Sequence, residues 1–358
     1  MHRTPICAEE QPGRRAPKAL ALLAALMAVA AITRAGDRRS YPQVGRQPDG
    51  SFIVSTCQRI VGGAIAFRAR PTDIALHPSG AYAAVLDQGS ILFVSPTGVV
   101  PRSHVLLEGA ASYRGIAWSP DGKRLFASVA AGFVQELVFR RGSIALGARI
   151  AVKPDSVSAN ARPGGMAITR DGKRLFVALA DRNSVAEIDL VANRLRREYG
   201  VQNVPFEVRL SADESALIVT NWGGRLPTRS DADDVATSGS ALVVVDPRGA
   251  ASTGTVSIVR RATGETRTLD VGLHPTAIAV DRDRAFVTNS GSDSLSEIDV
   301  KARRVVRSIP LTWRHVGLFG SMPCALAIRN GIAYVCNGGD NAVCVVDLAR
   351  GRVKGYLP

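Results

Sequence analysis

The chain has 358 residues, of which 46% are hydrophobic and 5% aromatic, a composition typical of a globular protein. It carries 45 lysine and arginine residues against 31 acidic ones, for a formal net charge of +14. The basic residues are scattered along the chain, whereas nucleic-acid binding requires one basic face with stacking aromatic residues, so a nucleic-acid partner is not expected. An anionic partner in the cell envelope is compatible with this charge.

The first 35 residues have the pattern of a secretory signal peptide. Basic residues precede an uncharged apolar run at residues 19–31, and small residues suited to a cleavage site follow. The run is short for a bilayer span, although an uncleaved N-terminal anchor is the alternative interpretation. We expect residues 1–35 to be removed on export to the periplasm or extracellular space, with residues 36–57 as a lead-in. No later segment reaches 18 apolar residues, so no membrane span is expected in the mature chain.

One pattern occurs six times from residue 71 onwards. Each copy begins with a short apolar strand and continues through a turn to a second strand, and successive copies start roughly 40 to 50 residues apart, with one longer interval. A period of this size with several short strands per unit is typical of β-propeller blades. The six first strands are expected at residues 71–76, 114–118, 164–168, 206–210, 275–280 and 323–328.

Within each copy the order of segments predicts a four-stranded antiparallel blade. The turn after the first strand contains residues that favour tight turns, as in Pro120-Asp121-Gly122. The third strand tends to end in aspartate, as at Asp189 and Asp299. Arginines recur late in the repeats, and we place them on outer strands, where charge prevents edge-to-edge pairing. These groups are Arg140-Arg141, Arg194-Arg196-Arg197, Arg260-Arg261 and Arg303-Arg304.

The predicted fold class is therefore all-β, a propeller over residues 58–358 with six full four-stranded repeats. Residues 58–63 take the position of an outer strand before the first repeat, and the chain as given stops after another outer strand. We expect residues 58–63 to be the outer strand of an incomplete seventh blade. Two interpretations stay open at this point, a ring of six blades and a ring of seven completed by further sequence.

The fourth repeat contains an insertion at residues 225–254. An insertion of this size on one repeat usually marks the binding face. It includes Asp231, Asp233 and Asp234, whose carboxylates could ligate Ca²⁺. The run lacks the glycine and closing glutamate of an EF-hand loop, so a solvated polar loop is the competing interpretation.

The strand end before the insertion supplies three more candidate binding residues. Asn221, Trp222 and Arg225 could line a ligand groove or a domain interface, because tryptophan and arginine are frequent in interface hot spots. The alternative is a tryptophan that caps the blade end and an arginine in solvent. With the three aspartates of the insertion, these residues form the predicted binding site.

No catalytic residue, metal site or cofactor is predicted. The histidines lie in separate repeats, and the sequence contains neither a Gly-x-Ser-x-Gly elbow nor a phosphate-binding glycine loop. Among the residues that begin the inner apolar triplets, only Asp73 and Glu207 can titrate, which is poor provision for a lactonase-type catalyst in the central channel.

The cysteines give no metal-binding spacing either. Cys324, Cys336 and Cys344 fall on the first three strands of the sixth repeat, and we interpret them as small buried thiols. Cys57 lies near the mature N-terminus, and a disulfide is possible in an exported protein.

The repeat pattern resembles the YVTN-repeat β-propeller family, most clearly at Leu217-Ile218-Val219-Thr220-Asn221 and Ala285-Phe286-Val287-Thr288-Asn289. Three stretches, at residues 220–227, 244–257 and 271–275, are similar to the propeller half of bacterial proteins that join such a propeller to an alkaline-phosphatase-type phosphoesterase domain. The resemblance implies a seven-bladed plan and an exported protein. The metal-binding set of the phosphoesterase domain has no counterpart here, so phosphatase activity is not implied. Repeat four departs from the pattern, because its third strand ends Val259-Arg260-Arg261.

Together these observations predict an exported, non-catalytic propeller module that binds a protein partner or a ligand. The resemblance implies a phosphoesterase domain as the partner. The alternative is a hydrolase, either a propeller lactonase or a phosphoesterase if this chain is part of a longer protein.

Overall fold

The computed structural model describes residues 43–53, 59–60, 70–95, 98–140, 143–154, 160–238, 241–312 and 320–357. The chain divides into two compact units, residues 1–45 and residues 46–358. The predicted signal peptide, Cys57 and half of the lead-in lie outside the described residues. No helix in the described ranges is both long enough and apolar enough to cross a membrane.

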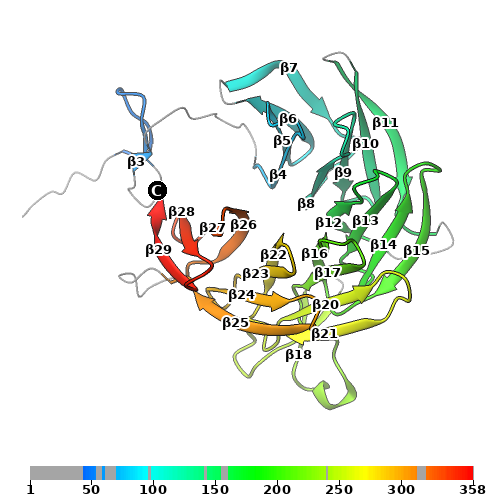
Figure 1. The fold of residues 1–358 in the computed structure, drawn as a ribbon, viewed down its shortest axis with the longest axis vertical. Helices are drawn as coiled ribbons and strands as arrows, with labels where there is room; N and C mark the ends of the chain where they lie inside the picture. Colours follow the sequence, from blue (N-terminus) through cyan, green and yellow to red (C-terminus); the bar gives the residue numbers. More distant parts are fainter. Residues whose placement is uncertain are drawn as a thin grey trace, which may run out of the picture. The chain divides into compact units, whose positions relative to one another are not determined.

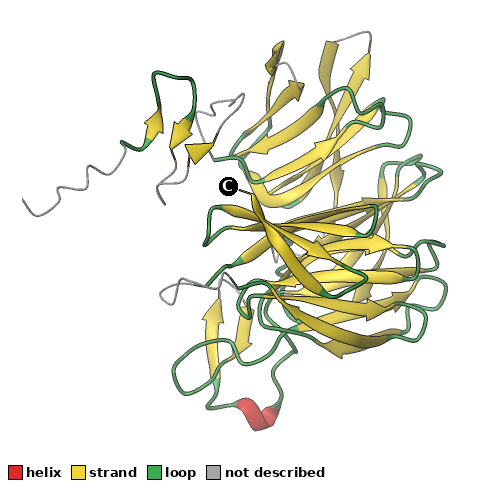
Figure 2. Ribbon diagram, turned by 60° about the vertical axis from the view of Figure 1, so that its left-hand side comes forward, coloured by secondary structure: helices red, strands yellow, loops and turns green. Residues whose placement is uncertain are grey.

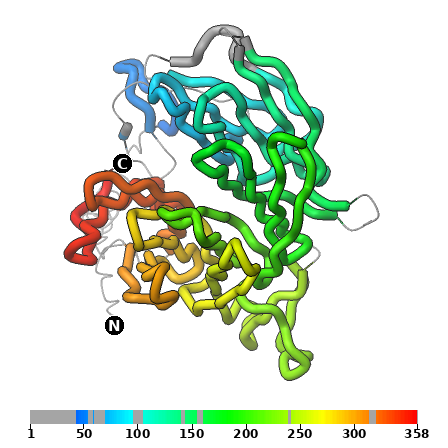
Figure 3. Tube along the Cα trace, turned by 45° about the vertical axis from the view of Figure 1, so that its right-hand side comes forward, coloured from blue at the N-terminus to red at the C-terminus, as the bar shows by residue number. Residues whose placement is uncertain are grey.

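From residue 73 onwards the chain forms six consecutive four-stranded antiparallel sheets, which are the blades of a β-propeller (Figure 1). This confirms the predicted fold class. Each blade runs in chain order from its inner to its outer strand, and Figure 3 follows the chain from one blade to the next. Consecutive inner strands contact one another from the first blade to the sixth, so the blades are arranged in sequence order about a common axis.

The first three blades have these strands. Blade 1 contains β4 (Asp73–Leu76), β5 (Ala83–Asp87), β6 (Ser90–Ser95) and β7 (Gly98–Leu106). Blade 2 contains β8 (Ala111–Trp118), β9 (Arg124–Val129), β10 (Phe133–Arg140) and β11 (Ser143–Ala151). Blade 3 contains β12 (Pro163–Ile168), β13 (Arg174–Leu179), β14 (Ser184–Asp189) and β15 (Arg194–Gly200).

The last three blades follow the same plan. Blade 4 contains β16 (Pro205–Leu210), β17 (Ala216–Asn221), β20 (Thr255–Arg260) and β21 (Thr266–Asp270). Blade 5 contains β22 (Pro275–Asp281), β23 (Arg284–Asn289), β24 (Ser294–Asp299) and β25 (Arg304–Pro310). Blade 6 contains β26 (Pro323–Arg329), β27 (Ile332–Asn337), β28 (Ala342–Asp347) and β29 (Arg352–Leu357).

A small sheet precedes the blades. It has the order β1 (Gly45–Arg46), β2 (Phe52–Ile53) and β3 (Arg59–Ile60), and β3 pairs antiparallel with β2. The sequence predicts an outer strand at residues 58–63. The structure describes β3 from this range, and β3 pairs with β2.

The predicted turns between first and second strands form as the sequence indicates. In blade 2, Ser119 Oγ and Lys123 N both donate to Asp121 Oδ1, at 2.6 and 3.1 Å. These hydrogen bonds lower the pKa of Asp121, because they stabilise its charged form. Asp171 and Asp213 fix the corresponding turns of blades 3 and 4 in the same way. A short local motif thus closes each hairpin, which is why the sequence alone could locate it.

The hydrophobic core consists of layers between neighbouring blades. Second and third strands of the middle blades are buried on both faces, as expected for strands that pack against a blade on each side, whereas the second strand of blade 6 alternates between buried and exposed residues. One layer joins blades 2 and 3 and includes Phe126, Ile150 and Leu175, and four equivalent clusters join the other consecutive pairs. Because each blade buries its faces against its neighbours, stability depends on nearest-neighbour packing.

Candidate functional site

The insertion and the mouth of the central channel lie on the same side of the propeller. Neighbouring strands of a blade run in opposite directions. The loop between the second and third strands therefore lies on the same side of the propeller as the loop that enters the inner strand. We call this side the insertion face. The insertion is one such loop, and it contains the 3-10 turn η1 (Arg229–Asp231) and a hairpin of β18 (Val235–Ser238) and β19 (Ala241–Val244). Figure 2 shows the hairpin and the 3-10 turn projecting away from the strands of the blades.

The structure places Asn221 inside blade 4. Its side chain is fully buried at the end of β17, and Nδ2 donates to Thr255 Oγ1 and Ser257 Oγ on β20, at 3.1 and 3.0 Å. Asn289 in blade 5 makes the same contacts with Ser294 and Ser296. The repeated asparagine therefore joins the second strand to the third, and its side chain is not part of the insertion surface.

Trp222 stacks face to face on His274, with ring centroids 4.4 Å apart and an interplanar angle of 14°. Trp222 follows β17, and His274 lies in the loop that enters β22, so the stack joins blade 4 to blade 5. Burial lowers the pKa of His274, because the imidazolium loses hydration there. The neutral imidazole is therefore the form that this stack favours.

Arg225 and Asp231 form a bidentate ion pair at the base of the insertion. Arg225 Nη1 donates to Asp231 Oδ2 at 2.7 Å, and Nη2 donates to Oδ1 at 2.5 Å. Thr228 donates to Asp231 Oδ2 through both its amide and its hydroxyl, at 2.7 and 2.6 Å. The Arg225 guanidinium, followed by the Thr228 contacts, holds the pKa of Asp231 well below its usual range. Sequence reasoning selected both residues but did not pair them.

The other two aspartates of the insertion, Asp233 and Asp234, have exposed side chains. The oxygens of Asp231 are already engaged by Arg225 and Thr228, so the three acids do not converge on one point. Within the described ranges, no three histidine, cysteine or acidic side chains gather closely enough to hold a metal ion. The solvated-loop interpretation therefore describes Asp233 and Asp234 but not Asp231, which is buried and paired with Arg225.

The three stretches that carry the phosphoesterase-linked resemblance meet in space beneath the insertion. Arg225 N donates to Thr253 Oγ1 at 3.2 Å, and Val271 N donates to Gly254 O at 2.9 Å. Gly254 is required for this approach, because a Cβ there would lie 1.9 Å from Gly272 O. Asn203 Nδ2 also donates to Leu242 O at 2.6 Å, which fixes the hairpin from the neighbouring loop. The residues of these three stretches thus form the base of the insertion and hold it in place.

The mouth of the central channel is a cavity of about 780 Å³ lined by residues of blades 1, 2, 4 and 6. Arg114 lies at this cavity, and its Nε is 2.5 Å from Oε2 of Glu207. The N–H does not point along this contact, so the interaction is an ion pair and not a hydrogen bond. Burial opposes the charge of Arg114, but attraction to Glu207 and Asp73 outweighs it, and the pKa of Arg114 is raised.

The Glu207 carboxylate also contacts Arg209, with Nη2 2.5 Å from Oε1. Glu207 is only 1% exposed, whereas Arg209 lines a second cavity of about 540 Å³ on the opposite side. The chain Arg114–Glu207–Arg209 therefore lies between the two cavities along the channel. In this ionic cluster the Glu207 carboxylate contacts two arginines, and Asp73 adds a further attraction to Arg114.

Sequence reasoning found Glu207 but missed Arg114, because it considered only the residues that begin the inner apolar triplets, and in the second repeat that residue is Gly115. The register of β8 against β9 shifts between Ala111 and Ile116, and Arg114 lies within this bulge. A bulge redirects side chains relative to a regular strand. The same irregularity occurs at the start of β26, where Cys324 is exposed and lines the mouth. The interpretation of buried thiols is correct for Cys344 and wrong for Cys324 and Cys336, which are exposed.

No protein-family model matches the chain, and no curated protein matches it. Among solved structures, hydrazine synthase of Kuenenia stuttgartiensis is similar, with a TM-score of 0.63 and 17% sequence identity. The match covers 84% of this chain and 90% of that chain. At this identity the likeness supports the β-propeller fold and carries no activity over to this chain.

Proposed function

We propose that this chain is an exported, non-catalytic propeller module that binds a protein partner through its insertion face. The partner we infer is a phosphoesterase domain of the alkaline-phosphatase type, because the residues that build the base of the insertion resemble propellers joined to such a domain. The observation that carries the proposal is the insertion itself, a projecting hairpin with a firmly held base.

A projecting loop serves as a binding surface when its base is held and its outer side chains remain available. The base is held by the Arg225–Asp231 pair and by the bond from Asn203 to Leu242 O. Meanwhile the Leu242 side chain is 53% exposed and that of Leu226 is 39% exposed. Apolar side chains presented on a held loop favour protein contacts, because their burial supplies affinity at little ordering cost.

The binding proposal is tested with the full chain and a separately expressed phosphoesterase domain, using calorimetry. We expect saturable binding that Leu242→Asp weakens at least about tenfold, because a carboxylate would replace an apolar contact. The matched control is Leu146→Asp, which changes a leucine of similar exposure on β11, away from the insertion, and should leave affinity unchanged. The proposal is wrong if no such domain binds, or if both variants bind as the parent does.

The non-catalytic part is tested on the same purified chain. We expect no turnover of lactones or phosphate esters above background. Steady hydrolysis that chelation abolishes would instead establish the hydrolase alternative. Export is tested by the mass of the chain recovered from the periplasm or medium, which should begin near residue 36 if the leader is removed.

A further inference from the structure

An ionic unit recurs in the blades, built on a buried glutamate of the third strand. Glu136, Glu187 and Glu297 each form an ion pair with an arginine of the second strand. These arginines are Arg124, Arg174 and Arg284. In blades 3 and 5 an outer-strand arginine also contacts the glutamate, with Arg197 Nε 3.0 Å from Glu187 Oε2 and Arg307 Nε 2.6 Å from Glu297 Oε2.

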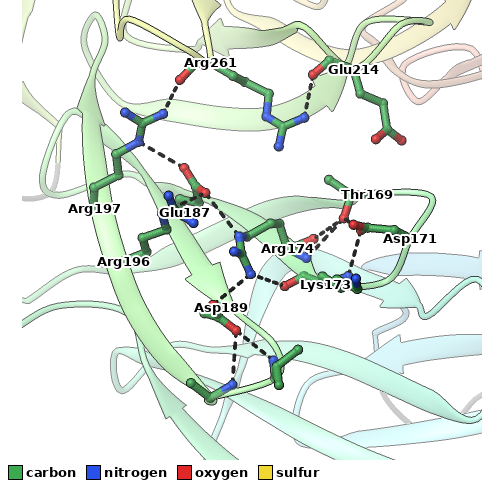
Figure 4. Close-up of polar contacts among 12 residues, drawn as sticks. Thr169, Asp171, Lys173, Arg174, Glu187, Asp189, Arg196, Arg197, Glu214 and Arg261 are labelled. Atoms are coloured by element: carbon green, nitrogen blue, oxygen red, sulfur yellow. Dashed lines mark hydrogen bonds and ion pairs between the residues drawn. The ribbon is translucent and has the colours of Figure 1, made fainter.

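The outer-strand arginines of this unit reach the next blade. Arg197 Nη2 donates to the carbonyl oxygen of Arg261 in blade 4, as Figure 4 shows, and Arg307 Nη2 donates to the carbonyl oxygen of Leu348 in blade 6. The unit therefore fastens neighbouring blades to each other. In blades 3 and 5 the unit consists of one glutamate and two arginines. We take this set as the charged residues that an interface between neighbouring blades requires.

The interface between blades 3 and 4 carries three arginines beyond this requirement. Arg196 stands where blade 5 has Val306, next to the equivalent Arg307. Arg260 ends the third strand where blade 5 has Asp299, and Arg261 follows where blade 6 has Leu348. The outer-strand placement of Arg260 and Arg261 was therefore wrong, whereas the expectation that the third strand of repeat four ends at Val259-Arg260-Arg261 agrees with β20. Arg140 was misplaced in the same way, because it ends the third strand of blade 2.

The three additional arginines line a basic cleft of about 530 Å³ between blades 3 and 4. Its charged lining consists of Arg174, Arg196, Arg197, Arg260, Arg261 and Glu187. Glu187 is almost fully buried, and its Oε2 accepts from Arg197 and from the Tyr199 hydroxyl, the latter at 2.7 Å. Its Oε1 lies 3.5 Å from Arg174 Nε and 3.6 Å from Arg196 Nε. Asp189 and Glu265 lie at the margin, where they pair with Arg174 and Arg260.

Each of the three additional arginines retains N–H donors for a further acceptor. The Arg196 side chain is 55% exposed, and its contact to Glu187 is long at 3.6 Å. The Arg260 side chain is half exposed and pairs with Glu265 at 3.4 Å. Arg261 Nη1 donates to Glu214 O, but its buried Nε has no hydrogen-bond partner among the described residues. The guanidinium of Arg261 is held over the Phe176 ring at 4.9 Å.

We propose that this cleft is a binding site for a small multivalent oxyanion of the phosphate class. Guanidinium groups match tetrahedral phosphate oxygens through forked, charge-assisted hydrogen bonds. Clustered like charges destabilise a fold unless an anion offsets them, and the other interfaces of this chain show that the scaffold does without the three additional arginines. The site lies on the side opposite the insertion face, at the turns between first and second and between third and fourth strands.

The test is calorimetric titration of the full chain with inorganic phosphate, pyrophosphate and a sugar phosphate at constant ionic strength. We expect saturable binding, tightest for pyrophosphate if free polyvalent anions are the ligands, and tightest for the sugar phosphate if an ester is. The triple variant Arg196→Val, Arg260→Asp, Arg261→Leu restores the residues that this chain uses elsewhere, and it should weaken binding at least about tenfold. Pyrophosphate should also raise the Tm of the parent and not that of the variant.

The charge-matched control is Arg329→Gln, Arg352→Asp, Lys354→Gln, which lowers net charge equally at exposed positions of blade 6. It should bind as the parent does. Loss of binding in both variants would mean nonspecific attraction and would overturn the proposal, as would affinity of the triple variant within twofold of the parent, or no saturable binding at all. Should the triple variant fail to fold, Arg196→Val alone alters an exposed side chain, and unchanged affinity there would also overturn it.

Discussion

Arg114 of blade 2 and Glu207 of blade 4 form an ion pair across the central channel, although blade 3 separates their strands in the ring. Most other contacts in this fold join consecutive blades. The pair therefore adds a direct connection between non-adjacent blades, at a point where both side chains are largely withdrawn from water.

We predict an unequal response to removing the two partners of this pair. Glu207→Leu removes the ion-pair partner of the buried Arg114 and leaves only the weaker attraction of Asp73, so it should lower the free energy of unfolding by about 3 kcal/mol. Arg114→Met should cost less, because Glu207 keeps its contact with Arg209. Urea unfolding monitored by circular dichroism measures both.

The double variant Arg114→Met, Glu207→Leu completes this experiment as a thermodynamic cycle. Its destabilisation should be smaller than the sum of the single changes, because no unpaired charge remains at Arg114. Additive effects would show that the two side chains do not interact in the folded protein.

Features set by local chemistry could be predicted from the sequence, and features set by register could not. The turn at Asp121 depends on its immediate neighbours, so the sequence located it. The exposure of Cys324 and the position of Arg114 depend on bulges at the starts of β26 and β8, which the repeat pattern does not encode. The partners Arg225 and Asp231 were selected, but their pairing required the path of the insertion.

The misplacement of Arg260 has a related cause. The repeat pattern identifies a third strand by the aspartate that ends it, and blade 4 has arginine at that position. Two positions for Arg260 therefore followed from the sequence, the end of the third strand and the outer strand, and the structure shows the first. Arg260, which departs from the repeat pattern at this strand end, is also one of the arginines that line the basic cleft.

Gly254→Ala should destabilise the propeller strongly. A Cβ at this position would meet the backbone oxygen of Gly272 at 1.9 Å, so the loop into blade 5 must move. We expect a loss of at least about 2 kcal/mol in the free energy of unfolding. Gly200→Ala is the control, because a Cβ there meets nothing within 4 Å, and it should change stability by less than about 0.5 kcal/mol. Equal stability of the two variants would contradict the close approach.

Asp231→Asn should loosen the insertion without unfolding the blades. The amide cannot form the bidentate pair with Arg225, so the base of the insertion loses its strongest polar connection. We expect thermolysin to cleave within the insertion about fivefold faster, with the global Tm nearly unchanged. Asp233→Asn removes the same charge from an exposed neighbour and should cleave at the parent rate. Identical rates in both variants would mean that the ion pair does not hold the loop.

His274 should make stability depend on pH near neutrality. Its folded pKa is lowered from the ordinary value of 6.5, chiefly by burial. Below pH 6.5 the unfolded chain therefore binds more protons than the folded chain at this residue. Stability from this residue is consequently complete above pH 6.5 and is lost as the pH falls below it.

His274→Phe tests this dependence, because phenylalanine keeps a ring to stack on Trp222 but cannot take up a proton. The backbone at this position has a positive φ of 48°, so the variant carries a constant strain, and the informative quantity is the slope of stability against pH. Between pH 7 and pH 5 we expect the parent to lose stability more steeply than His274→Phe in urea unfolding. Equal slopes would show that His274 is as hydrated in the folded chain as in the unfolded one, and that the stack with Trp222 does not exclude water.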